Sequence, residues 1–221
     1  MKLFFGAVAK FLLGVVLVGV LIFLPAGTFA FFEGWIFMGL LFVPMFGAGL
    51  VMLAKSPELL QRRLDAKEKA TTQKGVVALS GLMFIGGFVV AGLDHRFGWS
   101  AMPLWVTVTA SVLFLVAYAL YAEVLRENAY LSRTIKVEEG QTVVDTGLYG
   151  VVRHPMYMAT LLLFLMMPLV LGSWWALLVF AAYPAIIITR LKDEESLLTR
   201  ELPGYAEYKQ KVKYRLLPFI W

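Results

Sequence analysis

The chain has 221 residues, of which 60% are hydrophobic and 16% are charged, and its formal net charge is +5. Soluble globular domains are about half apolar and about a quarter charged, so this composition indicates an integral membrane protein. The absence of cysteine excludes disulfide bonds, cysteine-ligated metals and cysteine nucleophiles. The length suits one membrane bundle without a separate soluble domain.

Six apolar segments follow one another along the chain, at about 3–24, 35–54, 76–93, 101–125, 157–171 and 174–189. The first four have the roughly 17–25 residues that a helix needs to cross a bilayer. The last two are shorter and are separated only by Gly172 and Ser173, which predicts a tight helical hairpin on a thinned or tilted path. The predicted fold is therefore an all-α, polytopic membrane bundle with about six transmembrane helices.

The N-terminal segment has a second interpretation, because Lys2, the apolar run after it and residues 28–30 together resemble a secretory signal peptide. We favour an uncleaved membrane helix. The apolar run is longer than the usual core of a signal peptide, and no secreted domain follows it.

The basic residues predict the orientation of the bundle. With a cytoplasmic N-terminus, the segments 55–75, 126–156 and 190–221 are cytoplasmic and contain 17 of the 20 lysines and arginines. This distribution follows the positive-inside rule, so we expect both termini in the cytoplasm. The net positive charge then reflects topology and attraction to anionic membrane lipids, and no nucleic-acid partner is expected.

Three polar stretches accompany the spans. Residues 56–74 predict a charged loop with a short amphipathic surface helix, and 126–156 predict an ordered loop that leads into the fifth span. Residues 190–215 continue the last helix to Leu202-Pro203-Gly204 and then resume a helical pattern. We divide the chain into a four-helix membrane anchor, 1–125, and a C-terminal region, 126–221, within one integrated domain.

Polar and aromatic residues gather at 147–149 and 153–157, where the fifth span begins. Side chains that are costly to hold at a membrane are usually functional. Pro155 suits the first position of a helix, and the free N–H groups of that helix end attract an anion such as a carboxylate or phosphate. The alternative is that Arg153 and His154 are ordinary basic residues flanking a membrane helix.

Arg190 and Glu194 are four residues apart and share one face of the last helix. They could form an intrahelical ion pair, although Arg before Glu is the weaker orientation of such a pair. In the functional interpretation, the planar guanidinium of Arg190 binds a substrate carboxylate or phosphate, and Glu194 accepts hydrogen bonds from ligand hydroxyls or an amine. Asp193 and Glu195 are expected to be solvated on other faces.

Other features of the sequence give weaker signals. Several tyrosines could form an interfacial aromatic belt, namely Tyr149, Tyr157, Tyr205, Tyr208 and Tyr214. This interpretation suits Tyr208 and Tyr214 better than Tyr149 and Tyr157, which lie on either side of the Arg-His-Pro turn at 153–155. Neither His95 nor His154 has companions at metal-ligand spacing, so no metal site is expected. Glycine-rich nucleotide motifs of soluble folds are also absent.

Together these residues resemble the isoprenylcysteine carboxyl methyltransferase family and its relatives among membrane phospholipid methyltransferases. The resemblance covers roughly 134–218 and rests on the segments 141–149 and 153–157, Arg190, the pair 194–195, Leu198, 204–205, Tyr208 and 215–218. It implies that the C-terminal region is catalytic and binds S-adenosylmethionine between a cytoplasmic loop and the terminal hairpin. It also implies a lipophilic substrate that enters from the bilayer.

Carried over by position, the resemblance assigns two groups of site residues. The expected cofactor contacts are Gln141, Thr142, Val143, Val144, Tyr149, His154, Pro155, Met156, Tyr157 and Glu194. Arg190 and Glu194 are the expected catalytic residues, with Arg190 at the position that binds the substrate carboxylate. Gln141 departs from the family, which often has histidine there.

The function expected from these observations is transfer of a methyl group from S-adenosylmethionine to a lipophilic acceptor, by resemblance an isoprenylcysteine carboxylate, at the cytoplasmic membrane face. Phospholipid N-methylation and thiol S-methylation are alternatives with the same cofactor. A sterol-reductase-like enzyme that uses NADPH is another, because such proteins have comparable membrane hairpins. A non-enzymatic membrane scaffold or small transporter is the remaining alternative.

Overall fold

The computed structural model describes residues 2–64, 71–128, 130–131, 137 and 139–221. In these residues every regular element is helical. The elements are α1 (Lys2–Ala26), α2 (Phe32–Lys55), α3 (Pro57–Leu64), α4 (Thr71–Phe97), α5 (Leu104–Glu127), the 3-10 helix η1 (Gly147–Gly150), α6 (Pro155–Val170), α7 (Trp174–Phe180), α8 (Tyr183–Glu201) and α9 (Tyr205–Lys211).

Within the described ranges, five helical segments are long and apolar enough to cross a membrane. These are α1, α2, α4, α5 and the segment Trp174–Glu201, which contains α7 and α8. The sixth apolar helix, α6, is shorter at 16 residues. The predicted all-α polytopic membrane bundle is therefore confirmed, as is the continuation of the last helix up to Leu202.

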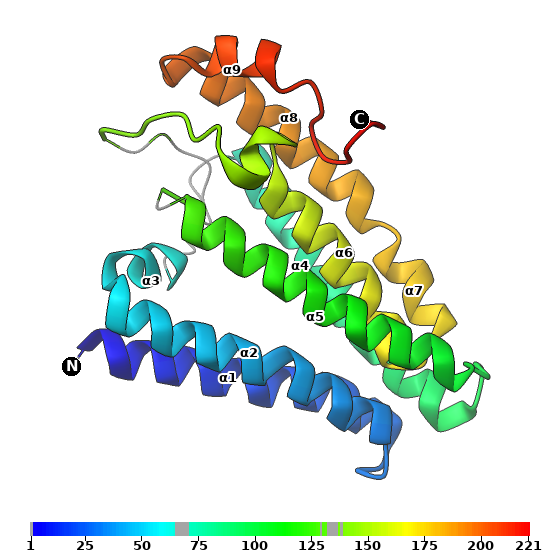
Figure 1. Cartoon of the computed structure of the whole chain (residues 1–221). Helices are drawn as coiled ribbons and strands as arrows, with labels where there is room; N and C mark the ends of the chain where they lie inside the picture. The colour runs from blue at the N-terminus through cyan, green and yellow to red at the C-terminus, as the bar shows by residue number, and fades with distance from the viewer. Residues whose placement is uncertain (1, 65–70, 129, 132–136, 138) are drawn as a thin grey trace.

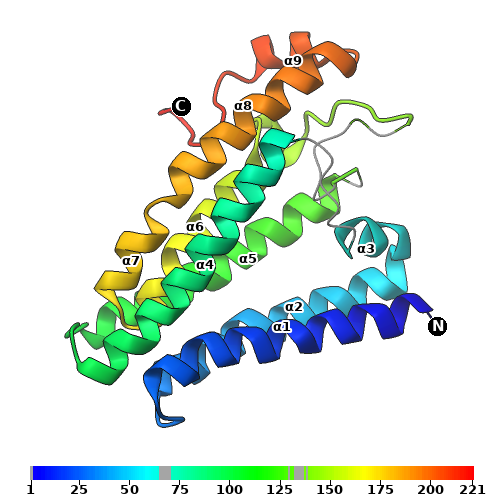
Figure 2. The same cartoon turned by 180° about the vertical axis from the view of Figure 1, so that it is seen from behind.

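The helices have two distinct ends (Figures 1 and 2). At one end lie the connections α1–α2, α4–α5 and α6–α7, and at the other lie α3, η1, α9 and the C-terminal tail. The α1–α2 hairpin and α8 diverge toward this second end. The polar segments singled out in the sequence thus lie at one end of the bundle.

The turn between α6 and α7 is fixed by polar contacts at the first end. Gly172 has φ +73°, a left-handed conformation that favours glycine, and the Ser173 hydroxyl caps α7 by accepting from the Ala176 N–H at 3.0 Å. Ser173 also donates to the buried carboxylate of Asp94, which accepts from the Ser100 N–H at 2.7 Å as well. One carboxylate therefore joins α4, the loop after it and the helical hairpin.

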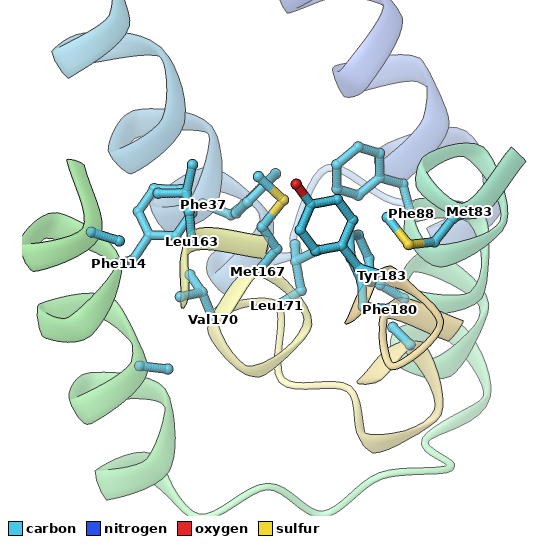
Figure 3. Packing of buried hydrophobic residues seen from close by; sticks show 14 of the residues in the cluster. Phe37, Met83, Phe88, Phe114, Leu163, Met167, Val170, Leu171, Phe180 and Tyr183 are labelled. Carbon is cyan, nitrogen blue, oxygen red and sulfur yellow. The ribbon is translucent and has the colours of Figure 1, made fainter. Parts of the chain in front are cut away.

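A buried aromatic cluster fills the centre of the bundle. Figure 3 shows Phe88 of α4, Phe180 of α7, Tyr183 of α8 and Met167 of α6 close together in this cluster. The rings of Phe88 and Phe180 have centroids 5.8 Å apart. Because these side chains come from helices far apart in the sequence, their packing holds the terminal hairpin against the N-terminal helices.

Glycines permit two of the closest contacts between helices. A Cβ at Gly87 would overlap the ring of Phe180, and a Cβ at Gly92 would overlap the backbone carbonyl of Ile22 on α1. Small residues allow membrane helices to pack at such short range. As a result, α4 lies directly against both α1 and α7, and it extends from this contact to the polar end.

Candidate functional site

The loop before α6 depends on a glycine. Gly147 has φ +51°, and a Cβ there would overlap the carboxylate of Glu127 at the end of α5. That carboxylate accepts a hydrogen bond from the Leu148 N–H at 3.1 Å. A side chain at position 147 would therefore displace the anchor that joins η1 to α5.

Tyr149 connects this loop to the neighbouring elements. Its hydroxyl accepts a hydrogen bond from Nδ2 of Asn128 at 2.9 Å, and its carbonyl accepts one from the Tyr208 hydroxyl of α9 at 2.8 Å. Burial raises the pKa of Tyr149 and that of Tyr208 well above their ordinary values. Both side chains are consequently neutral hydrogen-bonding groups at physiological pH.

The start of α6 is as predicted, with Pro155 as the first helical residue and His154 in a non-helical conformation. The C-terminal tail forms backbone hydrogen bonds with the two residues that precede α6. The N–H of Arg153 donates to the Tyr214 carbonyl, and that of His154 donates to the Arg215 carbonyl, both at 2.9 Å. The tail therefore holds the entry to α6 in place.

Glu195 is the centre of a buried ionic cluster. Its side chain lies within 2.9 Å of Nε of Arg153, 3.0 Å of Nε of Arg215 and 3.4 Å of Nε2 of His154. The residue is only 5% exposed, so the expectation that Glu195 is solvated is wrong. Asp193 also differs from that expectation, because its Oδ2 accepts a hydrogen bond from Nε2 of Gln73 at 2.7 Å.

Arg190 and Glu194 are joined by a tyrosine from the facing helix. The Tyr157 hydroxyl donates to the Glu194 carboxylate and accepts from Nε of Arg190 at 3.2 Å. Nη1 of Arg190 also donates to Oε1 of Gln73 at 3.1 Å. The two helix-face residues predicted from their spacing thus belong to a hydrogen-bonded network that includes α4 and α6.

A cavity at the polar end is lined by every predicted site residue except Pro155. Pro155 is buried and begins α6 without facing this cavity. The lining includes the two charged residues Glu194 and Arg190. It also includes Leu198, Leu202, Tyr205 and Tyr208, which come from α8, α9 and the segment between them.

Sequence reasoning missed several of the lining residues. Asn128 lies at the end of α5 and had no motif around it, whereas Arg153 was treated as a possible flanking residue. Tyr205 and Tyr208 were interpreted as candidates for an interfacial belt, yet both are buried. The sequence signal for three of them was the spacing of Leu198, Leu202 and Tyr205 across the end of α8, which is compatible with one shared side of the cavity.

In the part of the chain that the structure describes, no three His, Asp or Glu residues are grouped so that they could hold a metal ion. Together the helices and the cavity define a polytopic, all-helical membrane protein with a polar site at one end of its bundle.

Residues 106–200 match the model of the isoprenylcysteine carboxyl methyltransferase (ICMT) family. The matched residues include η1, α6, α7 and nearly all of α5 and α8, and they contain most of the residues that line the cavity. The resemblance predicted from the motifs is thereby confirmed.

Individual relatives are more distant. Over 91 residues, or 40% of its length, the chain is 30% identical to the Delta(14)-sterol reductase TM7SF2 of Mus musculus, and it spans 22% of that protein. Among solved structures, the chain is similar to the eukaryotic intramembrane Ras methyltransferase ICMT. That similarity has a TM-score of 0.47 and 17% identity, and it covers 99% of this chain and 85% of the other.

Proposed function

We propose that the protein transfers a methyl group from S-adenosylmethionine to the carboxylate of a lipophilic, isoprenylcysteine-type acceptor. The observation that carries this proposal is the network of Arg190, Tyr157 and Glu194 beside the cavity, within the region that matches the ICMT family. There, the cationic residue Arg190 and the anionic residue Glu194 line the same cavity at the end of a membrane bundle.

The cavity residues fit S-adenosylmethionine in charge and in polarity. The carboxylate of Glu194 suits the positively charged part of this cofactor, and the apolar wall of Leu198 and Leu202 suits its purine. Segment 141–144, from the loop before η1, also lines the cavity. When bound, the cofactor supplies an electrophilic methyl group on a sulfonium.

In the proposed mechanism, Arg190 binds the acceptor carboxylate through its guanidinium. Tyr157 and Gln73 hold two of the guanidinium nitrogens, which fixes its plane. A carboxylate is already ionised near neutral pH, so no general base is needed. The reaction is an in-line displacement, and correct orientation of the reactants can contribute up to about 7–11 kcal/mol.

We also propose that the site faces the cytoplasm and that both termini lie there. The excess of basic residues in segments 55–75, 126–156 and 190–221 supports this orientation. Membrane lipids surround the spans, and a lipophilic acceptor reaches Arg190 from the bilayer. The anchor 1–125 and the region 126–221 then act as one integrated domain, because Gln73 of the anchor contacts Arg190.

The test is calorimetric binding of S-adenosylhomocysteine to the purified full chain, followed by radiolabelled methyl transfer. We expect the wild type to bind, Glu194→Ala to lose binding, and Glu201→Ala, which removes an exposed carboxylate from the same helix, to bind normally. Transfer to a prenylcysteine mimic, but not to lipid extract or small thiols, is the expected selectivity. Unchanged affinity in Glu194→Ala contradicts the assigned cofactor site.

A second candidate function is reduction of a sterol by NADPH. The 30% identity to a Delta(14)-sterol reductase over 91 residues favours it specifically. Thermal stabilisation of the protein by NADPH and not by S-adenosylmethionine or S-adenosylhomocysteine supports this candidate against the first.

A further inference from the structure

Tyr205, the first residue of α9, carries a buried hydroxyl that has no hydrogen-bond partner among the residues the structure describes. The residue is 4% exposed and lines the candidate cavity. Tyr208, on the same helix, is also buried, but its hydroxyl donates to the Tyr149 carbonyl at 2.8 Å. The two tyrosines are therefore alike in burial and different in hydrogen bonding.

The Tyr205 ring packs within an apolar cluster at the cavity. The ring lies in an apolar cluster with Leu202, Tyr208 and Val212, against which Val143 packs from the loop. The centroids of the Tyr205 and Tyr208 rings are 5.6 Å apart. A buried hydroxyl without a partner is destabilising, so its retention at a cavity wall indicates that a ligand supplies the partner.

The surroundings of this hydroxyl limit which ligand group it can contact. Burial raises the pKa of Tyr205 well above its ordinary value, and the charges of Glu195 and Glu194 raise it further. The hydroxyl is thus neutral. The carboxylates of Glu195 and Glu194 near it disfavour the carboxylate of a ligand, while the charge of Arg153 acts in the opposite sense. The apolar cluster around the ring disfavours a desolvated ammonium.

We propose that the Tyr205 hydroxyl forms a hydrogen bond with an uncharged polar group of the nucleoside part of the methyl donor, a ribose hydroxyl or a purine nitrogen. This inference rests on the proposed function and adds α9 to the cofactor site. Arg190 and Glu194 lie on α8, so Tyr205 would bind the donor from the C-terminal side of the cavity.

The test compares wild type and Tyr205→Phe in binding S-adenosylhomocysteine and 5′-methylthioadenosine, which lacks the amino-acid part. Loss of one neutral hydrogen bond is expected to weaken the binding of both compounds roughly 3- to 10-fold. The melting temperature of the ligand-free protein should stay the same or rise, because Phe removes the unpaired hydroxyl.

Two matched variants separate this role from a structural one. Tyr208→Phe removes a satisfied hydroxyl and should lower the melting temperature of the ligand-free protein. Tyr214→Phe removes a hydroxyl that does not line the cavity and should bind S-adenosylhomocysteine as the wild type does.

The possible results lead to different conclusions. Equal affinity of wild type and Tyr205→Phe overturns the inference and leaves the proposed function intact. The same conclusion holds if Tyr205→Phe has a lower melting temperature and its loss of affinity is no larger than this loss of stability explains. Weakening for S-adenosylhomocysteine alone assigns the contact to the amino-acid part and overturns the nucleoside assignment. A wild type that does not bind S-adenosylhomocysteine overturns the proposed function and this inference with it.

Discussion

Gln73 on α4 accepts a hydrogen bond from Nη1 of Arg190 on α8 and donates one to Oδ2 of Asp193 on the same helix. These bonds measure 3.1 and 2.7 Å, and Gln73 is only 2% exposed. Residue 73 precedes the region that matches the ICMT family. The N-terminal helices therefore contribute a polar group directly to the candidate site.

Replacing Gln73 with Leu should remove one of the hydrogen bonds that orient the Arg190 guanidinium and lower kcat/KM for the acceptor by roughly 10- to 100-fold. Binding of S-adenosylhomocysteine should be unchanged, since Gln73 does not line the cavity. Steady-state kinetics with a prenylcysteine mimic, together with calorimetry, measure both quantities. Gln61→Leu, at an exposed glutamine of α3, is the control, and equal activity of the two variants contradicts a positioning role.

Replacing Arg190 with Ala should abolish turnover while sparing binding of the demethylated cofactor. Arg190→Lys should not restore the rate, because a lysine ammonium cannot reproduce the planar, two-point contact with a carboxylate. Arg200→Ala removes an exposed charge from α8 and should behave as the wild type. Loss of cofactor binding with retained turnover in Arg190→Ala is the pattern that contradicts this assignment.

Replacing Glu195 with Ala should destabilise the protein by about 3–5 kcal/mol, because the buried guanidinium of Arg153 loses its ion-pair partner and the imidazole of His154 loses the same carboxylate. Thermal unfolding of the ligand-free protein in detergent measures the effect. Glu207→Ala, at an exposed carboxylate of α9, is the control. A melting temperature like that of the control would contradict a stabilising role of Glu195 in this cluster.

Replacing Gly147 with Ala should move η1 away from Glu127, because the new Cβ occupies the position of that carboxylate. We expect S-adenosylhomocysteine to bind at least roughly tenfold more weakly, since η1 carries Tyr149 into the cavity. Gly140→Ala is a matched control with φ +71° and open space around its Cα. It has the same backbone strain without the overlap, so similar affinities in both variants would assign the effect to strain alone.

The sequence predicted the spans, the α6–α7 hairpin and the start of α6 at Pro155, because each depends on local hydrophobicity or on backbone restrictions of glycine and proline. It also placed Arg190 and Glu194 on one face through helical spacing. The burial of Glu195 and the bond between Gln73 and Asp193 could not be predicted. Helical periodicity says which residues share a face, but not which distant segment packs against that face.

The pairing of Arg153 and His154 with the carbonyls of Tyr214 and Arg215 has a consequence for biosynthesis. The loop that leads into α6 leaves the ribosome long before the tail that satisfies its N–H groups. Insertion of the spans and completion of the cavity are thus separate events. The cavity therefore reaches its final form only after residues 214 and 215 have been translated.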